Sequence, residues 1–85
     1  MIEQILQERQ KTHGDFKEQA EISQILKDQI ALTEGYKRML NSTQREALQM
    51  IAHKIARILA GDPNEVDHWR DIAGYATLVV KELEK

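Results

Sequence analysis

The stretch HKIARILAGDPNEVDHWRDIAGYA, residues 53–76, decides the fold. Apolar residues recur at three- and four-residue intervals on both sides of a short Gly-Asp-Pro segment, which predicts two amphipathic helices joined by a tight turn. Gly61 is expected to end the first helix. Asp62 is expected to cap the second, with Pro63 at its first position and Glu65 completing a capping box. A connection of about three residues makes the two helices antiparallel neighbours.

The periodicity elsewhere predicts an all-α chain with four helices. Their expected bounds are residues 2–11, 16–32, 42–60 and 62 to the C-terminal end. Residues 36–41 fit either an additional helical turn or a loop. The architecture expected is a hairpin core formed by the last two helices and completed by association with other chains.

Local signals place the other helix ends. Gly14 is suited to a left-handed residue after the first helix, and Asp15 to the N-cap of the second. Thr43 and Glu46 have the spacing of a capping box at the start of the third helix.

The length of 85 residues indicates a single domain, residues 1–85. A chain this short buries only about 60–65% of its unfolded surface, so an isolated monomer would be marginally stable. It has no cysteine and therefore no disulfide or thiolate zinc site. Stability must come from close helix packing or from other subunits, and we expect a homo-oligomer, either a dimer or a tetramer.

The charge balance is close to neutral, with 12 Lys and Arg against 14 Asp and Glu, which argues against general nucleic-acid binding. The longest mostly apolar stretch, residues 72–80, is far below the roughly 20 residues that span a bilayer, so no membrane partner is expected. The polar beginning, MIEQILQERQ, differs from a secretion signal. The cytoplasm is the expected compartment.

Charged residues face each other across the predicted hairpin. Folding the chain back at residues 61–62 brings Arg57 level with Asp67, and Lys54 level with Arg70 and Asp71. One interpretation is a set of surface ion pairs, each worth about 0–1 kcal/mol, that only orients the helices. The other is a ligand site, because Lys54, Arg57 and Asp71 adjoin the apolar stripes and charges at a core margin need specific partners.

Gly74 and Tyr75 add to this candidate site. A glycine inside a helix costs about 1 kcal/mol relative to alanine, which close approach of a second helix or of a ligand would offset. Helix contact is the preferred explanation for Gly74. A buried Tyr75 hydroxyl would need a hydrogen-bond partner, and core filling competes with ligand binding as its role.

The first predicted turn holds further candidates. His13 lies in the sequence THGDF with Arg9 and Asp15 nearby, so this turn is either an ordinary connection or part of a binding site. The three histidines show no metal-binding spacing, and no metal or other cofactor is expected.

The motif Lys54-x-x-Arg57 followed by DHWRDIAGYA, residues 67–76, resembles the ending of a family of small phage and prophage proteins of unknown function. The opening, Arg9 followed by THGDF, resembles the usual start of that family. The resemblance covers nearly the whole chain.

The hairpin is more distantly similar to MazG-like all-α nucleotide pyrophosphohydrolases. Those enzymes hold magnesium with Glu-x-x-Glu on one helix and Glu-x-x-Asp on the next, and they assemble as dimers or tetramers. Here the corresponding positions are Lys54 and Arg57, then His68 and Asp71. Cations in place of carboxylates remove magnesium ligands, so the resemblance implies a shared fold with altered chemistry.

Three functions follow as hypotheses. The first is a non-catalytic phage-type protein that binds a nucleotide or another phosphorylated small molecule at Lys54 and Arg57. The second is a pyrophosphohydrolase in which Asp67 and Asp71 bind Mg²⁺, assisted by Glu18 or Glu21 of a neighbouring subunit. The third is a protein-interaction module that acts through its helices. The cations favour the first.

Overall fold

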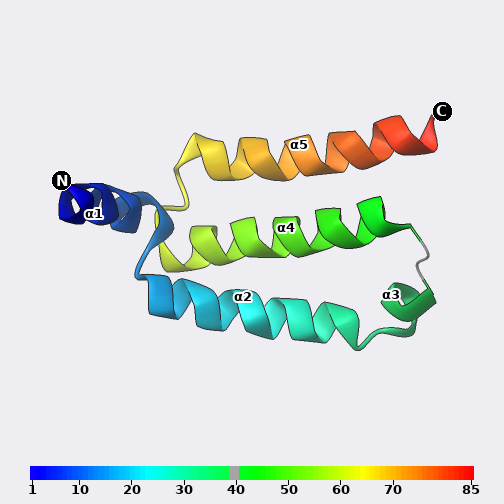
Figure 1. Cartoon of the computed structure of the whole chain (residues 1–85), viewed down its shortest axis with the longest axis horizontal. Helices are drawn as coiled ribbons and strands as arrows, with labels where there is room; N and C mark the ends of the chain where they lie inside the picture. Colours follow the sequence, from blue (N-terminus) through cyan, green and yellow to red (C-terminus); the bar gives the residue numbers. More distant parts are fainter. Residues whose placement is uncertain (39–40) are drawn as a thin grey trace.

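The computed structural model describes residues 1–38 and 41–85, and all regular structure in this part of the chain is helical. The helices are α1 (Ile2–His13), α2 (Phe16–Ala31), α3 (Glu34–Arg38), α4 (Ser42–Ala60) and α5 (Val66–Leu83). In Figure 1, α2, α4 and α5 lie side by side as a layer, with α1 beside one end and α3 at the other.

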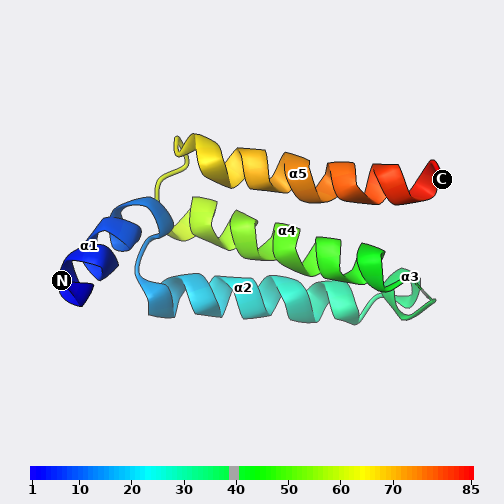
Figure 2. The same ribbon diagram turned by 45° about the horizontal axis from the view of Figure 1, so that its top comes forward.

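The central helix of the layer is α4, which packs against α2 on one side and α5 on the other. Figures 1 and 2 show both neighbours antiparallel to α4, which confirms the predicted hairpin. The all-α prediction is also confirmed for the described residues. None of the helices described is both long enough and apolar enough to cross a bilayer.

The connection between α4 and α5 is longer than predicted. The prediction that Asp62 caps α5 with Pro63 at its first position is wrong, because α5 begins at Val66. The Asp62 carboxylate instead accepts from the backbone N–H of Asn64 at 2.9 Å and closes a local turn. The indole N–H of Trp69 donates to the Pro63 carbonyl at 2.8 Å and holds this turn against the first turns of α5.

The other predicted helix ends are partly right. Asp15 caps α2 by accepting from the N–H of Glu18 at 3.3 Å, as predicted. The capping box of Thr43 and Glu46 is wrong, since the cap of α4 is Asn41. The Asn41 side-chain oxygen accepts from the N–H of Thr43 at 2.7 Å, a role for which asparagine is well suited.

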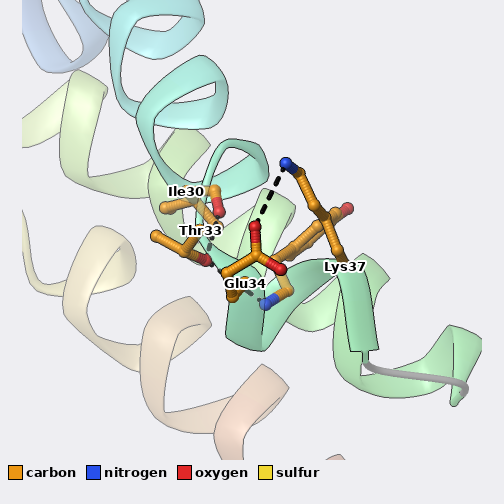
Figure 3. A network of polar contacts seen from close by, with 5 residues as sticks. Ile30, Thr33, Glu34 and Lys37 are labelled. Carbon is orange, nitrogen blue, oxygen red and sulfur yellow. Dashed lines mark hydrogen bonds and ion pairs between the residues drawn. The ribbon is translucent and has the colours of Figure 1, made fainter.

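A short polar network turns the chain from α2 into α3 (Figure 3). The Thr33 hydroxyl donates to the Ile30 carbonyl at 2.8 Å and accepts from the N–H of Tyr36 at 3.2 Å. Lys37 and Glu34 form an exposed ion pair at 3.5 Å. Residues 36–38, for which a helical turn or a loop was predicted, are therefore helical. With α3 the described part of the chain has five helices, where four were predicted. Met39 and Leu40 lie outside the described residues.

The core of the layer is made of small side chains. The buried apolar residues are Ala47, Ala52 and Ala56, all on α4, and no large side chain is fully buried among the described residues. Buried polar groups fill the remaining contacts: Gln19, Ser23, Lys54 and His68. Alanine lets the helices approach closely, but it buries little apolar area.

Two glycines bring the α1–α2 turn against the α4–α5 turn. Gly14 has a φ of +82°, and a Cβ there would clash with the Ala60 carbonyl. A Cβ on Gly61 would clash with the Thr12 carbonyl. The N–H of Asp62 donates to that same carbonyl at 3.0 Å. The left-handed φ predicted for Gly14 is confirmed, and the two turns pack backbone to backbone.

We predict opposite effects from alanine at two glycines. Gly14→Ala should lower the free energy of unfolding by about 1–3 kcal/mol, since only glycine populates this backbone conformation readily. That corresponds to a fall in Tm of at least about 4 °C in thermal unfolding followed by circular dichroism. The control, Gly74→Ala, meets nothing within 4 Å and should raise stability by up to about 1 kcal/mol. Equal destabilisation by both changes would contradict the turn contact.

Candidate functional site

Lys54 and Asp71 form the ion pair that the hairpin geometry predicted. The Lys54 Nζ lies 3.0 Å from the Asp71 Oδ2, and the two side chains are 10% and 47% exposed. Lys54 is buried because it points from α4 toward α5 within the layer, so its charge needs a partner. Asp71 supplies that partner, and the charge of Lys54 is balanced inside the hairpin.

Arg57, one helical turn further along α4, is left without such a partner. It forms no ion pair with any described residue, and its buried Nε has no hydrogen-bond partner among them. Burial lowers the pKa of Arg57, while the charges of Asp71 and Tyr75 act in the opposite direction. The predicted partner, Asp67, faces outward and pairs instead with Arg70 at 3.7 Å.

A pocket of about 530 Å³ opens between α1, α2 and α4 beside Arg57. Its lining consists of Leu6, Arg9, Gln10, His13, Gly14, Phe16, Gln19, His53 and Arg57. Two arginines and two histidines therefore face one cavity that has no aspartate or glutamate in its wall. The pocket is cationic, with an apolar side formed by Leu6 and Phe16.

The histidines report the positive potential of this pocket. Burial, and then the nearby charges of Arg57, His68, Lys54 and Arg9, lower the pKa of His13 to about 4. Burial and neighbouring cations, with Arg57 the strongest of these, also lower the pKa of His53. Both imidazoles are thus neutral near pH 7, and a bound anion would raise both pKa values.

His68 holds the end of α1, which forms part of the pocket wall, against α5. It is 2% exposed, and its Nε2 lies 2.7 Å from the Thr12 carbonyl. Because a carbonyl only accepts, the Nε2 must carry the proton and donate it. The ring of His68 also lies 5.4 Å from that of His13, centroid to centroid. His68 ties the end of α1 to α5.

The structure brings together only some of the predicted site residues. Arg9, His13 and Arg57 line the same pocket, with the Lys54–Asp71 pair close to Arg57. Tyr75 is half-buried and lines two shallow hollows further along α5. Asp67 lies on the outer surface. The second helix expected at Gly74 is not found, because nothing in the described structure lies within 4 Å of a Cβ placed there.

Six lining residues were not predicted as site residues from the sequence: Leu6, Gln10, Gly14, Phe16, Gln19 and His53. The Gln19 amide donates toward the Nε2 of His53 at 3.4 Å, which joins α2 to α4. One signal was available, since Arg9 and His13, and likewise His53 and Arg57, are four residues apart. Each pair therefore lies on one helix face.

Carboxylates do not gather around this pocket. Within residues 1–38 and 41–85, no group of three or more His, Asp or Glu side chains is arranged to hold a metal ion. Glu18 and Glu21 are exposed on α2, and the Oδ2 of Asp71 pairs with Lys54. The two aspartates of the hydrolase hypothesis are thus both engaged with cations.

The fold and the site define a small protein with a three-helix layer and a cationic pocket at one end. A family model described as a domain of unknown function, DUF6378, matches residues 2–83, so the chain belongs to this family. No match was found among curated proteins or among solved structures. The phage origin and the MazG-like relationship stay predictions.

We predict unequal effects from neutralising the two aspartates. Asp71→Asn should destabilise the chain by about 1–2 kcal/mol, because it leaves buried Lys54 without its counter-charge. Asp67→Asn, the matched control, should change stability by less than about 0.5 kcal/mol, since both members of its pair are about three-quarters exposed. Urea unfolding of the two variants tests this, and equal losses would contradict it.

We predict that stability falls as the pH drops from about 6.5 to about 4. His13 has an ordinary pKa of 6.5 when unfolded and about 4 when folded. In that window the unfolded chain binds the proton more readily, so protonation favours unfolding. Replacing His13 with glutamine should flatten the pH dependence of the unfolding midpoint in this window. An unchanged pH dependence in His13→Gln would contradict the assignment.

Proposed function

We propose that the protein binds a small phosphorylated ligand in the pocket between α1, α2 and α4. The observation that carries this proposal is the partly buried guanidinium of Arg57, which has no carboxylate partner among the described residues. A partly buried guanidinium without an ion-pair partner is costly, and a ligand anion would supply one.

The pocket offers suitable chemistry for a phosphate group. Arg9 and Arg57 approach from different helices, and guanidinium groups bind phosphate through paired, charge-assisted hydrogen bonds. His13 and His53 become additional donors if anion binding raises their pKa values. The volume of about 530 Å³ lies within the range of small-molecule sites.

The apolar side of the pocket supports a ligand with more than a phosphate group. Phe16 is 76% exposed and Leu6 is 57% exposed, and both line the cavity. A flat or apolar part of the ligand would cover them. A nucleotide, or another phosphorylated molecule that carries a ring, combines the two features.

Binding is preferred to hydrolysis. The hydrolase hypothesis requires Asp67 and Asp71 to release Arg70 and Lys54 before they could hold Mg²⁺. Releasing Lys54 would leave a buried charge without a partner. A binding role requires no ion pair to break, because Arg9 and Arg57 already line the pocket.

We also propose that the chain works as a homo-oligomer. Its helices would then bind another protein chain, as in the protein-interaction hypothesis, but the partner would be a second copy of this chain. The supporting observation is the alanine core, together with large apolar side chains left on the surface, among them Trp69 and Val80. Oligomer formation and ligand binding are compatible functions of one chain.

We predict that inorganic phosphate and phenyl phosphate bind to the wild-type chain in a phosphate-free buffer. Phenyl phosphate should bind more tightly, because its ring can cover Leu6 and Phe16. Arg57→Gln should weaken both at least about tenfold, the loss expected for a charge-assisted hydrogen bond. Calorimetric titration gives the affinities, and the shifts of the His13 and His53 ring protons in NMR locate the site.

The control for this titration is Arg70→Gln, which removes an exposed arginine away from the pocket. It should leave the affinities within about twofold of wild type. Equal weakening by Arg57→Gln and Arg70→Gln would indicate general charge attraction and contradict the pocket. Stabilisation by Mg²⁺ with release of pyrophosphate from a nucleotide would favour the hydrolase instead.

A further inference from the structure

One face of the layer carries no charged residue on α4 or α5. On α4, Leu48, Ile55 and Leu59 lie at spacings of seven and four residues, so they share a side of the helix. On α5 the matching side has the same character, with Trp69, Ala73, Ala76, Val80 and Leu83 at helical spacing. These eight residues define the charge-free face.

A groove joins the two halves of this face. It has a volume of about 310 Å³ and is lined by Gln44, Ala47, Leu48, Ile51, Ala76 and Val79. Leu48 and Ala76 belong to both the groove and the charge-free face, so α4 and α5 present one continuous surface. Trp69 at 54%, Val80 at 48% and Leu83 at 63% are exposed on it.

The charged groups lie on the other side of the layer. His53 and Arg57 are four residues apart on α4, about half a helical turn away from Ile55, and they face the cationic pocket. On α5 the hollow formed by Arg70, Asp71, Gly74, Tyr75 and Leu78 is also on that side. The α4–α5 hairpin therefore has one charged face, on the side of the ligand pocket, and one charge-free face.

The chain exposes more surface than a compact monomer of the same mass. A folded monomer of 9.8 kDa exposes about 5,200 Å², whereas this chain exposes 6353 Å². The excess of about 1,150 Å² exceeds the roughly 800 Å² that each partner buries in a standard interface. The radius of gyration, 14.4 Å, likewise exceeds the about 12 Å of a compact chain of this length.

We propose that the charge-free face is covered by the same face of a second copy of this chain. Interface cores are depleted of charge, and this face offers a basic or acidic partner nothing to pair with. A second copy brings an equally apolar surface, and a two-fold arrangement lets each groove receive side chains from the other chain. Two helical layers would then share one core.

The charge-free face is the surface for the self-association proposed above, on which its role rests, and it acts independently of the ligand. It leaves both cationic pockets on the outside of the pair, because they lie on the opposite faces of the two layers. A chain that pairs through the charge-free face without binding phosphate would therefore support this surface and contradict the ligand proposal. A chain that binds phosphate but stays monomeric would contradict this surface and leave the ligand proposal standing.

The first experiment compares two variants of nearly equal exposure. Val80 on the charge-free face is 48% exposed, and Leu78 on the charged side is 55% exposed. Val80→Glu should weaken self-association in sedimentation equilibrium at least about 100-fold, since its carboxylate would be buried without a partner. Leu78→Glu should stay within about threefold of wild type. A monomeric wild type at 100 μM, or equal losses in the two variants, would overturn the proposal.

A second experiment needs no destabilising substitution. The chain has no cysteine, so Ala76→Cys places a single thiol on the charge-free face with little change in size. Its reaction with a thiol reagent should slow at least about tenfold between 1 and 100 μM protein as pairs form. The thiol of Leu78→Cys should react at a rate that does not depend on the protein concentration. If the thiol of Ala76→Cys reacts at the same rate at every protein concentration, the proposed surface is wrong, even if the chain associates by another surface.

Discussion

The backbone contact between the two interhelical turns is the constraint on which the rest of the structure depends. The Thr12 carbonyl accepts from the N–H of Asp62 and from the Nε2–H of His68. Gly14 and Gly61 allow this approach because neither turn could carry a side chain there. Since α1 has no buried residue, this contact is what holds α1 beside the layer and completes the wall of the pocket.

The pocket owes its character to a difference between two cations one turn apart on α4. Lys54 points into the hairpin, where Asp71 balances its charge at 3.0 Å. Arg57 lines the pocket between α1, α2 and α4, whose other ionisable groups are Arg9, His13 and His53. The same helix thus contributes one cation to structural stability and presents the other to a ligand.

The extent to which the sequence predicts this molecule differs between levels. The apolar periodicity and the short connection were sufficient to predict the α4–α5 hairpin. They also predicted that Lys54 and Asp71 lie opposite each other across it. The start of α5 was missed, because the Asx turn of Asp62 and the bond from Trp69 to Pro63 outweigh the local capping signal. The pocket could not be placed, because its position depends on how α1 docks, and that depends on two turns meeting in space.

The weak attachment of α1 has a consequence for affinity. A segment without buried side chains undocks at a low free-energy cost, so the binding-competent form is one member of an equilibrium. The apparent affinity then equals the intrinsic affinity scaled by the docked population. Any change that holds the end of α1 more firmly against the α4–α5 turn would tighten ligand binding without touching the ligand.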